Sequence, residues 1–246
     1  INNPIKISST QKRKIKQSLK NILFVVLNES SVGISNARNK CLNYLKSADF
    51  DYGCYLDDDC FVKNDYLKNN LDFITKNNCD VVSGPQINIS KKKFHKVFER
   101  NFEHKMKIYW ASTNNVFFRK NITKSKIFFS NKVTKFGFGE DQLFFSKISR
   151  KGFVIKWNKF ACVFEIKKKR KENFHWFLTR NFKYGLTGVL IDIELYGIIE
   201  GIIINILKFG YNFALSLYYI LLIPIDPIKN FYFSISFLLR SFGRIL

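Results

Sequence analysis

The chain has 246 residues, enough for one sizeable domain and an appendage. Its five cysteines form no CxxC pair, which argues against a zinc site or a disulfide framework and for reduced thiols in a cytosolic setting. The formal net charge of +22 predicts an anionic partner or surface, although a general over-use of Lys, Asn, Ile and Phe accounts for part of it.

The charge divides the chain into two parts. From residue 186 onward four basic residues balance four acidic ones, namely Lys208, Lys229, Arg240 and Arg244 against Asp192, Glu194, Glu200 and Asp226. The whole excess therefore lies in residues 1–185. We expect a catalytic or binding domain over residues 1–185 and a helical tail over residues 186–246.

The first third of the chain alternates helical and strand patterns. Residues 11–20 form a basic, weakly helical segment, and residues 21–28 (NILFVVLN) have the length and β-branched content of a buried strand. A helix follows to Lys46, with Ser35 as its N-cap. An aromatic strand then runs from Tyr52 into three aspartates, and a helix over 64–76 turns Leu67, Leu71 and Ile74 inward.

The middle of the chain continues this alternation. Strands are predicted at 79–83, 110–119, 153–157 and 160–166, with a polar loop or lid over 86–107. A glycine-hinged turn at 137–141 leads into a helix over 142–151, and a further helix over 172–184 ends at Gly185 as its C-cap. The alternation predicts an α/β domain with a mostly parallel central sheet.

The tail is apolar. Residues 186–207 contain three acidic side chains and suit a helix lying in a membrane interface, and residues 209–225 suit one half of a re-entrant hairpin. The alternative is a helical cap packed on the globular domain. We expect membrane contact because so many Ile, Leu, Phe and Tyr residues follow a finished domain.

Three consecutive carboxylates, Asp57, Asp58 and Asp59, follow the strand that begins at Tyr52. Adjacent carboxylates repel one another, and a divalent cation of the Mg²⁺ or Mn²⁺ kind relieves that repulsion. The carboxyl ends of strands in an open α/β sheet also border the ligand crevice. The pattern therefore predicts a metal–phosphate site, the alternative being a solvated acidic turn.

The order of several short motifs resembles that of the GT-A-fold, family 2 type of glycosyltransferases, over about residues 20 to 185. These motifs are a GxSxARN segment (Gly33, Ser35, Ala37, Arg38, Asn39), the DXD-type aspartates, Thr113-Asn114-Asn115, Gly139-Glu140-Asp141, Glu165, Arg170, Arg180 and Gly185. The family's opening, a strand–helix–strand unit that holds the nucleobase, has no match in residues 1–20. We therefore expect the domain to be N-terminally incomplete.

The resemblance implies a reaction. The sugar of a nucleotide-diphosphate sugar would pass to an acceptor hydroxyl, and a cation held by Asp57 and Asp59 would neutralise the charge that grows on the leaving diphosphate, with Asp58 contacting the ribose or orienting the site. Asp141 would take the proton of the acceptor hydroxyl, with Glu140 positioning it, and a single displacement would invert the anomeric carbon. Both acidic clusters should then face one cleft. The alternative for Asp141 is an ordinary charge at a helix N-terminus.

Four further residues receive roles with open alternatives. Glu165 would approach the metal or diphosphate, or be a plain strand-edge residue. Arg38 would contact the diphosphate or base, or lie on a helix surface. Asn114 and Asn115 would line the donor-sugar pocket, or form a turn.

The resemblance implies three partners, namely a nucleotide-diphosphate sugar donor, a sugar or lipid-linked acceptor, and a membrane surface. That the donor is UDP-linked is also implied by the family alone and by no residue of this sequence. It places the protein on the cytoplasmic face of the cell membrane, peripheral or re-entrant, in bacterial surface polysaccharide or glycolipid synthesis. No nucleic-acid partner is expected. The alternatives are a basic nucleic-acid-binding protein, which would lack the acidic clusters, and a GT-A-like nucleotidyltransferase.

Overall fold

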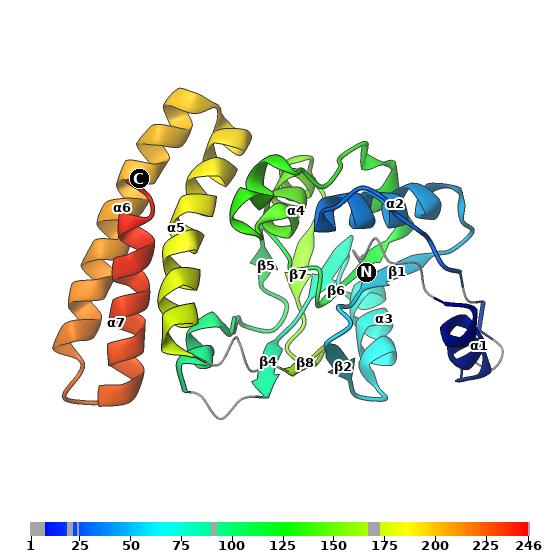
Figure 1. Cartoon of the computed structure of the whole chain (residues 1–246), viewed down its shortest axis with the longest axis horizontal. Coiled ribbons are helices and arrows are strands. Elements are labelled where there is room, and N and C mark those ends of the chain that lie inside the picture. Colours follow the sequence, from blue (N-terminus) through cyan, green and yellow to red (C-terminus); the bar gives the residue numbers. More distant parts are fainter. Residues whose placement is uncertain (1–7, 19–21, 24, 90–92, 167–172, 246) are drawn as a thin grey trace.

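The computed structural model describes residues 8–18, 22–23, 25–89, 93–166 and 173–245 (Figure 1). An α/β part is followed by three long helices that stand beside it. The helices are α1 (Ser9–Ser18), α2 (Ile34–Ser47), α3 (Tyr66–Lys76), α4 (Glu140–Arg150), α5 (Phe174–Tyr196), α6 (Ile198–Leu221) and α7 (Pro227–Phe242), with the 3-10 helices η1 (Lys93–Phe98), η2 (Lys120–Ser125) and η3 (Lys132–Phe136). The strands are β1 (Tyr52–Tyr55), β2 (Cys60–Val62), β3 (Val81–Ser83), β4 (Gln86–Ile89), β5 (Lys107–Ile108), β6 (Val116–Arg119), β7 (Ile155–Trp157) and β8 (Val163–Ile166).

The strands form two sheets. The larger has the order β1-β6-β3-β7-β5 and the smaller the order β2-β8-β4. Within the described residues only the β3–β7 and β4–β8 pairs are parallel, and the other four pairings are antiparallel. The α/β class is as predicted, but the pairing is mixed rather than mostly parallel, because β6 enters between β1 and β3 in the antiparallel sense.

Strand β6 explains how the larger sheet is covered on both faces. Its side chains alternate, so Phe118 packs with Leu42 of α2 and Phe144 of α4, whereas Phe117 packs with Phe73 of α3. Helices α2 and α4 therefore cover one face and α3 the other. A strand buried on both faces reads as a continuous apolar run, which is the pattern of residues 116–118.

The strand predicted over residues 21–28 is wrong for the described part of that segment. Residues 22–23 and 25–28 belong to no strand, and Ile22 and Leu23 are 62% and 86% exposed. An apolar run becomes a strand only when neighbouring strands satisfy its backbone N–H and C=O groups. Among the described residues no strand pairs with it, so its β propensity is not expressed.

Other local predictions also need correction. Gly33 is the N-cap of α2 and Ser35 lies inside the helix. On α3 the exposed Leu67 and Leu71 leave the inward face to Tyr66, Asn70, Phe73 and Ile74. The predicted loop over 86–107 holds β4, η1 and the start of β5, and the predicted strand over 110–119 is shortened to β6.

Helix α5 runs without a break through the predicted boundary at 185/186. Gly185 is therefore not a C-cap. It lies where α5 crosses α7, and a Cβ added there would meet the carbonyl oxygen of Arg240 and lie 2.7 Å from the Cα of Gly243. The glycine lets two helix backbones approach closely, which is the usual role of small residues between packed helices.

The three C-terminal helices have polar contacts inside and apolar side chains outside. Between the helices, Ser216 Oγ donates to Ser234 O (3.0 Å) and Ser236 Oγ donates to Asn181 Oδ1 (2.6 Å). The outer surface of α6 carries exposed Ile198, Ile199, Ile202, Ile203, Ile206 and Leu207. By length and composition, α6 is the helix within the described part of the chain that could cross a membrane. In a helix bundle of a soluble protein the apolar side chains face inward and the polar ones outward, which is the opposite arrangement.

Candidate active site

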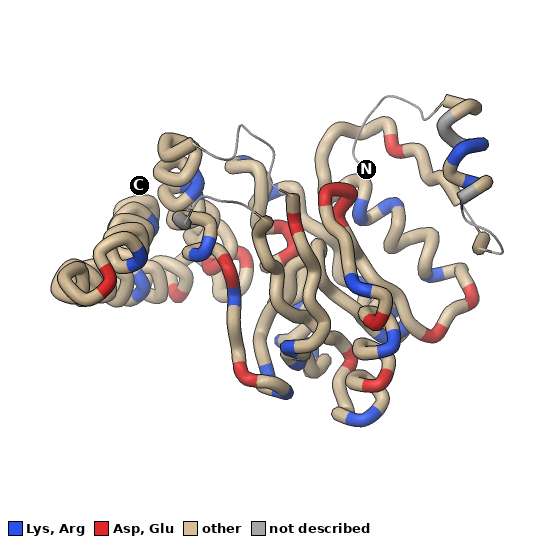
Figure 2. Tube along the Cα trace, turned by 90° about the horizontal axis from the view of Figure 1, so that it is seen from below, with Lys and Arg blue, Asp and Glu red and all other residues tan. Residues whose placement is uncertain are grey.

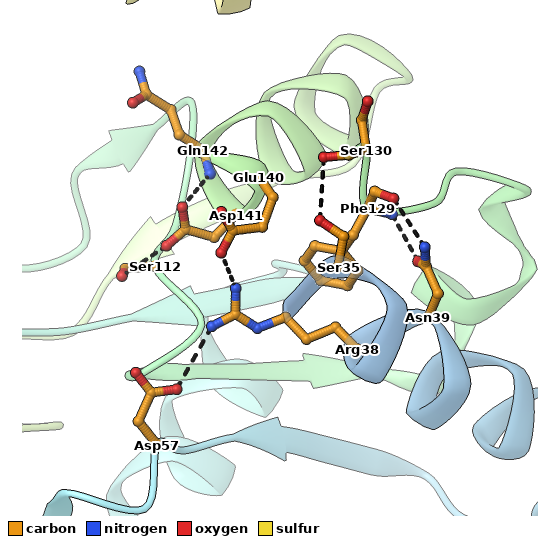
Figure 3. A network of polar contacts seen from close by, with 10 residues as sticks. All are labelled: Ser35, Arg38, Asn39, Asp57, Ser112, Phe129, Ser130, Glu140, Asp141 and Gln142. Carbon is orange, nitrogen blue, oxygen red and sulfur yellow. Dashed lines mark hydrogen bonds and ion pairs between the residues drawn. The ribbon is translucent and has the colours of Figure 1, made fainter. Parts of the chain in front are cut away.

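Two side chains of the GxSxARN segment fix helix α2 against the chain that precedes η3 (Figure 3). Ser35 Oγ donates to Ser130 O at 3.1 Å. The Asn39 amide donates to Phe129 O and accepts from Phe129 N, both at 2.8 Å. These contacts hold α2 in one orientation and aim Arg38, which lies between the two anchors in sequence, at the start of α4.

Arg38 joins the two acidic clusters. It is buried and forms a close ion pair with Glu140 Oε1, while its Nη2 lies 3.6 Å from Asp57 Oδ1 (Figure 3). The second oxygen of Glu140 is buried without a hydrogen-bond partner in the described structure. Burial and the neighbouring Asp141 raise the pKa of Glu140, and Arg38 opposes that rise. The two clusters thus meet on one side of the sheet, as predicted.

The aspartates occupy the turn between β1 and β2. The turn closes where Cys60 N donates to Asp57 O at 3.2 Å. Glu165 lies directly opposite Cys60 in the β2–β8 pairing. The pKa of Asp57 is raised, chiefly by burial. The positive charge of Arg38 opposes this rise, and the carboxylates of Asp59, Asp141 and Glu165 add to it. Burial and the carboxylates of Glu165, Asp57 and Asp59 raise the pKa of the Cys60 thiol to about 12. The carboxylates of Asp57, Asp59, Asp141 and Glu165 are therefore close enough to influence one another electrostatically.

This donor set fits a hard divalent cation. Carboxylate oxygens are the ligands that Mg²⁺ and Mn²⁺ prefer, and the mutual repulsion of Asp57, Asp59 and Glu165 is what such an ion relieves. Within the described residues, no three His, Cys, Asp or Glu side chains form a ready metal cage. Mg²⁺ is commonly held by one or two carboxylates together with substrate phosphates. The residues therefore suit a cation that is coordinated partly by these carboxylates and partly by a diphosphate. Asp58 in the same turn is exposed.

Asp141 is held in the first turn of α4. Its Oδ2 accepts from Ser112 Oγ (3.0 Å) and its Oδ1 from Gln142 N (2.7 Å). Gly139, the N-cap of α4, has φ +105°, which favours glycine, and it lies against Thr187 of α5, where a Cβ would clash. Acidic side chains are stabilising in the first turn of a helix. Sequence reasoning missed Ser112, which directly precedes the Thr113-Asn114-Asn115 motif.

The two candidate pocket asparagines differ in their surroundings. Asn115 is buried, where its Oδ1 accepts from Tyr66 OH (2.9 Å) and its Nδ2 donates to Pro85 O (2.9 Å) and Ala161 O (2.8 Å). Its amide is taken up by these contacts, and residues 113–115 form a turn that Asn115 N closes by donating to Ser112 O (3.1 Å), so of the two predicted alternatives the structure favours the turn. Asn114 is half-buried, and its Oδ1 has no hydrogen-bond partner among the described residues.

Two arginines flank this region. No sequence pattern marks Arg100, whose guanidinium lies 3.7 Å from the centre of the Trp110 ring. Burial lowers the pKa of Arg100 to about 10, although the nearby negative charge of Asp141 partly opposes this shift. Arg180 of α5 lies 3.8 Å from the centre of the Phe138 ring, next to the Gly139-Glu140-Asp141 turn. Arg170 and the basic run 167–171 lie outside the described residues.

Comparison with known proteins defines the class. Residues 9–153, more than half of the chain, match the family described as Glycosyl transferase family 2. The chain belongs to glycosyl transferase family 2, and the predicted resemblance and the α/β, GT-A class of its catalytic domain are confirmed.

The chain is similar to two solved structures. The crystal structure of S. aureus TarS 1-349 has 17% identity and a TM-score of 0.45, with 76% of this chain and 53% of that chain covered. The structure of S. aureus TarS 1-349 in complex with UDP-GlcNAc has 16% identity and a TM-score of 0.45, with 76% and 54% covered. The chain thus spans about half the length of these structures. No curated protein sequence matches it.

Proposed function

We propose that this protein is an inverting, metal-dependent glycosyltransferase that moves a sugar from a nucleotide-diphosphate sugar to a hydroxyl acceptor. One observation carries the proposal: Arg38 links the β1–β2 turn to the start of α4, so that carboxylates from both face a common region. Family membership supports the reaction class. A TarS structure holding UDP-GlcNAc makes that compound the first donor to test.

Asp57 and Asp59, with Glu165, would hold the cation, which when bound offsets the charge that grows on the leaving diphosphate. Asp58 would contact the ribose or orient the turn. Arg38 would meet the diphosphate or base once the donor enters, and Asn114, with its unpaired oxygen, would face the donor sugar.

Asp141 would act as the general base. The acceptor oxygen attacks the anomeric carbon, the bond from that carbon to the diphosphate oxygen breaks, and the hydroxyl proton passes to Asp141. Ser112 and the N–H of Gln142 already fix both oxygens of this carboxylate. Glu140, paired with Arg38, would position Asp141. A single displacement of this kind inverts the anomeric configuration.

The test is a donor screen with Mn²⁺ or Mg²⁺ on the longest natural form of the protein that contains this chain. Asp59→Ala and Asp141→Asn should each lower turnover by about 10²-fold or more, whereas Asp72→Asn, at an exposed position of α3, should leave it unchanged. Full activity in either variant, activity unaffected by EDTA, or a retained anomeric configuration by NMR would contradict the respective assignment.

We also propose that the protein works at the cytoplasmic face of the cell membrane, in surface polysaccharide or glycolipid synthesis. The apolar outer surface of α6 and the polar contacts between α5, α6 and α7 support this placement. The excess positive charge of residues 1–185 suits an anionic leaflet, and five free cysteines suit a reducing compartment.

A further inference from the structure

A cavity of about 470 Å³ lies between the α/β part and the C-terminal helices. Its walls come from η3, α5, α6 and the residues after α7. Most of the lining side chains are apolar and include Leu186, Val189 and Leu190 of α5 with Ile202, Ile206 and Phe209 of α6. A volume of this size is typical of a small-molecule site, and its lining suits a hydrocarbon chain.

The charged residues that line the cavity are both basic. They are Lys135 of η3 and Arg244, which follows α7. Arg244 Nη1 forms an ion pair with buried Asp192 (3.0 Å) and bonds Asn205, and its Nε is buried without a hydrogen-bond partner in the described structure. Asp192 also pairs with Lys208 (2.7 Å), so two cations share one carboxylate and this side of the cavity keeps a positive charge. A cavity with apolar walls and cations is complementary to an amphiphile with an anionic head.

The cavity is continuous with the surface that we propose faces the membrane. Ile202 and Ile206 line it and also belong to the exposed apolar row of α6. Charged residues are sparse along α6 and α7 (Figure 2). A hydrocarbon chain could therefore pass sideways from a bilayer into the cavity without crossing a charged barrier.

A short stretch of chain joins the cavity to the candidate active site. Lys135 and Phe136 line it, and the chain continues from them through Gly137-Phe138-Gly139 to Glu140 and Asp141. Gly139 lies against Thr187 of α5, one residue from the cavity-lining Leu186. The two sites thus share the η3–α4 connection and one turn of α5.

We propose that this cavity binds the hydrocarbon chain of a lipid-linked acceptor, with Lys135 and Arg244 meeting the phosphate that joins the chain to the acceptor group. This inference rests on the proposed function and deepens it, because it names the acceptor as a lipid phosphate. The nearby Asp141 would then receive the hydroxyl proton of the group carried beyond that phosphate.

A binding experiment tests the cavity independently of sugar transfer. Alkyl phosphates of four to sixteen carbons are titrated calorimetrically into the detergent-solubilised chain. We expect one saturable site for dodecyl phosphate, with affinity rising about fourfold per added CH₂ at intermediate chain lengths. Dodecyl trimethylammonium, which has the opposite charge, should bind at least about tenfold more weakly.

Two pairs of variants locate the site. Val189→Trp fills the cavity and Lys135→Glu reverses a charge at it, and each should weaken dodecyl phosphate binding about tenfold or more. Their controls are Leu217→Trp on the outer face of α6 and Lys124→Glu at an exposed position of η2, which should leave binding unchanged. Circular dichroism confirms that each variant is folded, and Ile206→Trp replaces Val189→Trp if that variant unfolds.

Equal weakening in the variants and their controls, or equal binding of both head groups, would overturn the proposal and indicate general adsorption to the apolar surface. If the site behaves as expected but no glycosyl transfer is found, the proposed function fails while the lipid phosphate site stands. If transfer proceeds equally well to acceptors with and without a lipid chain, the acceptor assignment fails and the glycosyltransferase assignment stands.

Discussion

Arg38 lies between two carboxylates that come from distant parts of the chain, Asp57 and Glu140. Because Glu140 is buried, removing its cation leaves an uncompensated charge in the interior. We expect Arg38→Met to lower the free energy of unfolding by about 3–5 kcal/mol, measured by urea titration.

The double variant Arg38→Met/Glu140→Gln removes both charges and should recover most of the loss. If the double variant is as unstable as Arg38→Met alone, the cost comes from lost packing of the arginine stem and not from the ion pair.

The pKa of Glu140 leads to a second residue-level prediction. Burial and Asp141 raise this pKa above its ordinary value, so the folded protein binds the proton more tightly than the unfolded chain does. The stabilising contribution of protonated Glu140 is fully present below the unfolded-state pKa and is lost as pH rises through the raised folded-state pKa.

The stability of wild type relative to Glu140→Gln should therefore be greatest at the acid end and should fall as pH rises. Unfolding free energies of both proteins measured from pH 4 to pH 8 check this. A relative stability that increases with pH would mean that attraction to Arg38 outweighs burial and that the pKa is lowered instead.

The residues of the site were predictable to different degrees. Asp57, Asp59 and Asp141 could be found because carboxylates at a strand end and at a helix start form local patterns. Ser112 and Arg100 could not, because no spacing encodes the hydrogen bond of Ser112 to Asp141, 29 residues away, or the electrostatic influence of Asp141 on Arg100. For Asn115 the sequence left a pocket role and a turn role open, because its motif does not reveal that Tyr66, Pro85 and Ala161 take up its amide.

At the scale of the element, the crossing of α5 and α7 depends on Gly185. A side chain there would collide with the backbone of α7 at Arg240 and Gly243. Because backbone cannot yield as a flexible side chain does, Gly185→Ala should lower the unfolding free energy by about 1–3 kcal/mol. The measurement is chemical unfolding followed by helix circular dichroism.

Gly210 of α6 supplies the matched control. It also lies within a helix, but nothing would lie within 4 Å of an added Cβ. Gly210→Ala should therefore raise stability by about 0.5–1 kcal/mol through helix propensity alone. Destabilisation of similar size in both variants would mean that the close helix crossing is not the cause.

The elements also show where periodicity is a sufficient guide. Helices α2 and α4 were predictable because their apolar spacing coincides with the side that packs on the sheet. Residues 22–28 have the composition of a strand, but a strand needs hydrogen-bonded neighbours that composition does not specify. Helix α5 was predicted to end at Gly185 because a mid-helix glycine and a C-cap glycine are alike until the neighbouring helix is known.

For the whole molecule, the two parts differ in how their apolar side chains are placed. The α/β part buries Phe, Ile and Trp around its larger sheet, whereas the outer surface of α6 exposes Ile199, Ile203 and Leu207 at 76%, 53% and 68%. Burying an aliphatic side chain of this size is worth about 1.5–3 kcal/mol. Leaving so many of them exposed to water is costly, and our proposal that a bilayer covers this surface accounts for it, since the contacts between the helices are polar.

The last prediction tests whether the outer surface of α6 contacts a membrane. The triple variant Ile199→Asn, Ile203→Asn and Leu207→Asn removes three residues spaced four apart on α6 and leaves the cavity lining intact. It should reduce partitioning into vesicles of phosphatidylcholine and phosphatidylglycerol by about a hundredfold or more in a flotation assay. The control, Ile22→Asn with Leu23→Asn, changes exposed apolar residues of the α/β part and should leave flotation unchanged. Flotation lost in the control but kept in the triple variant would place the membrane contact on the α/β part and not on α6.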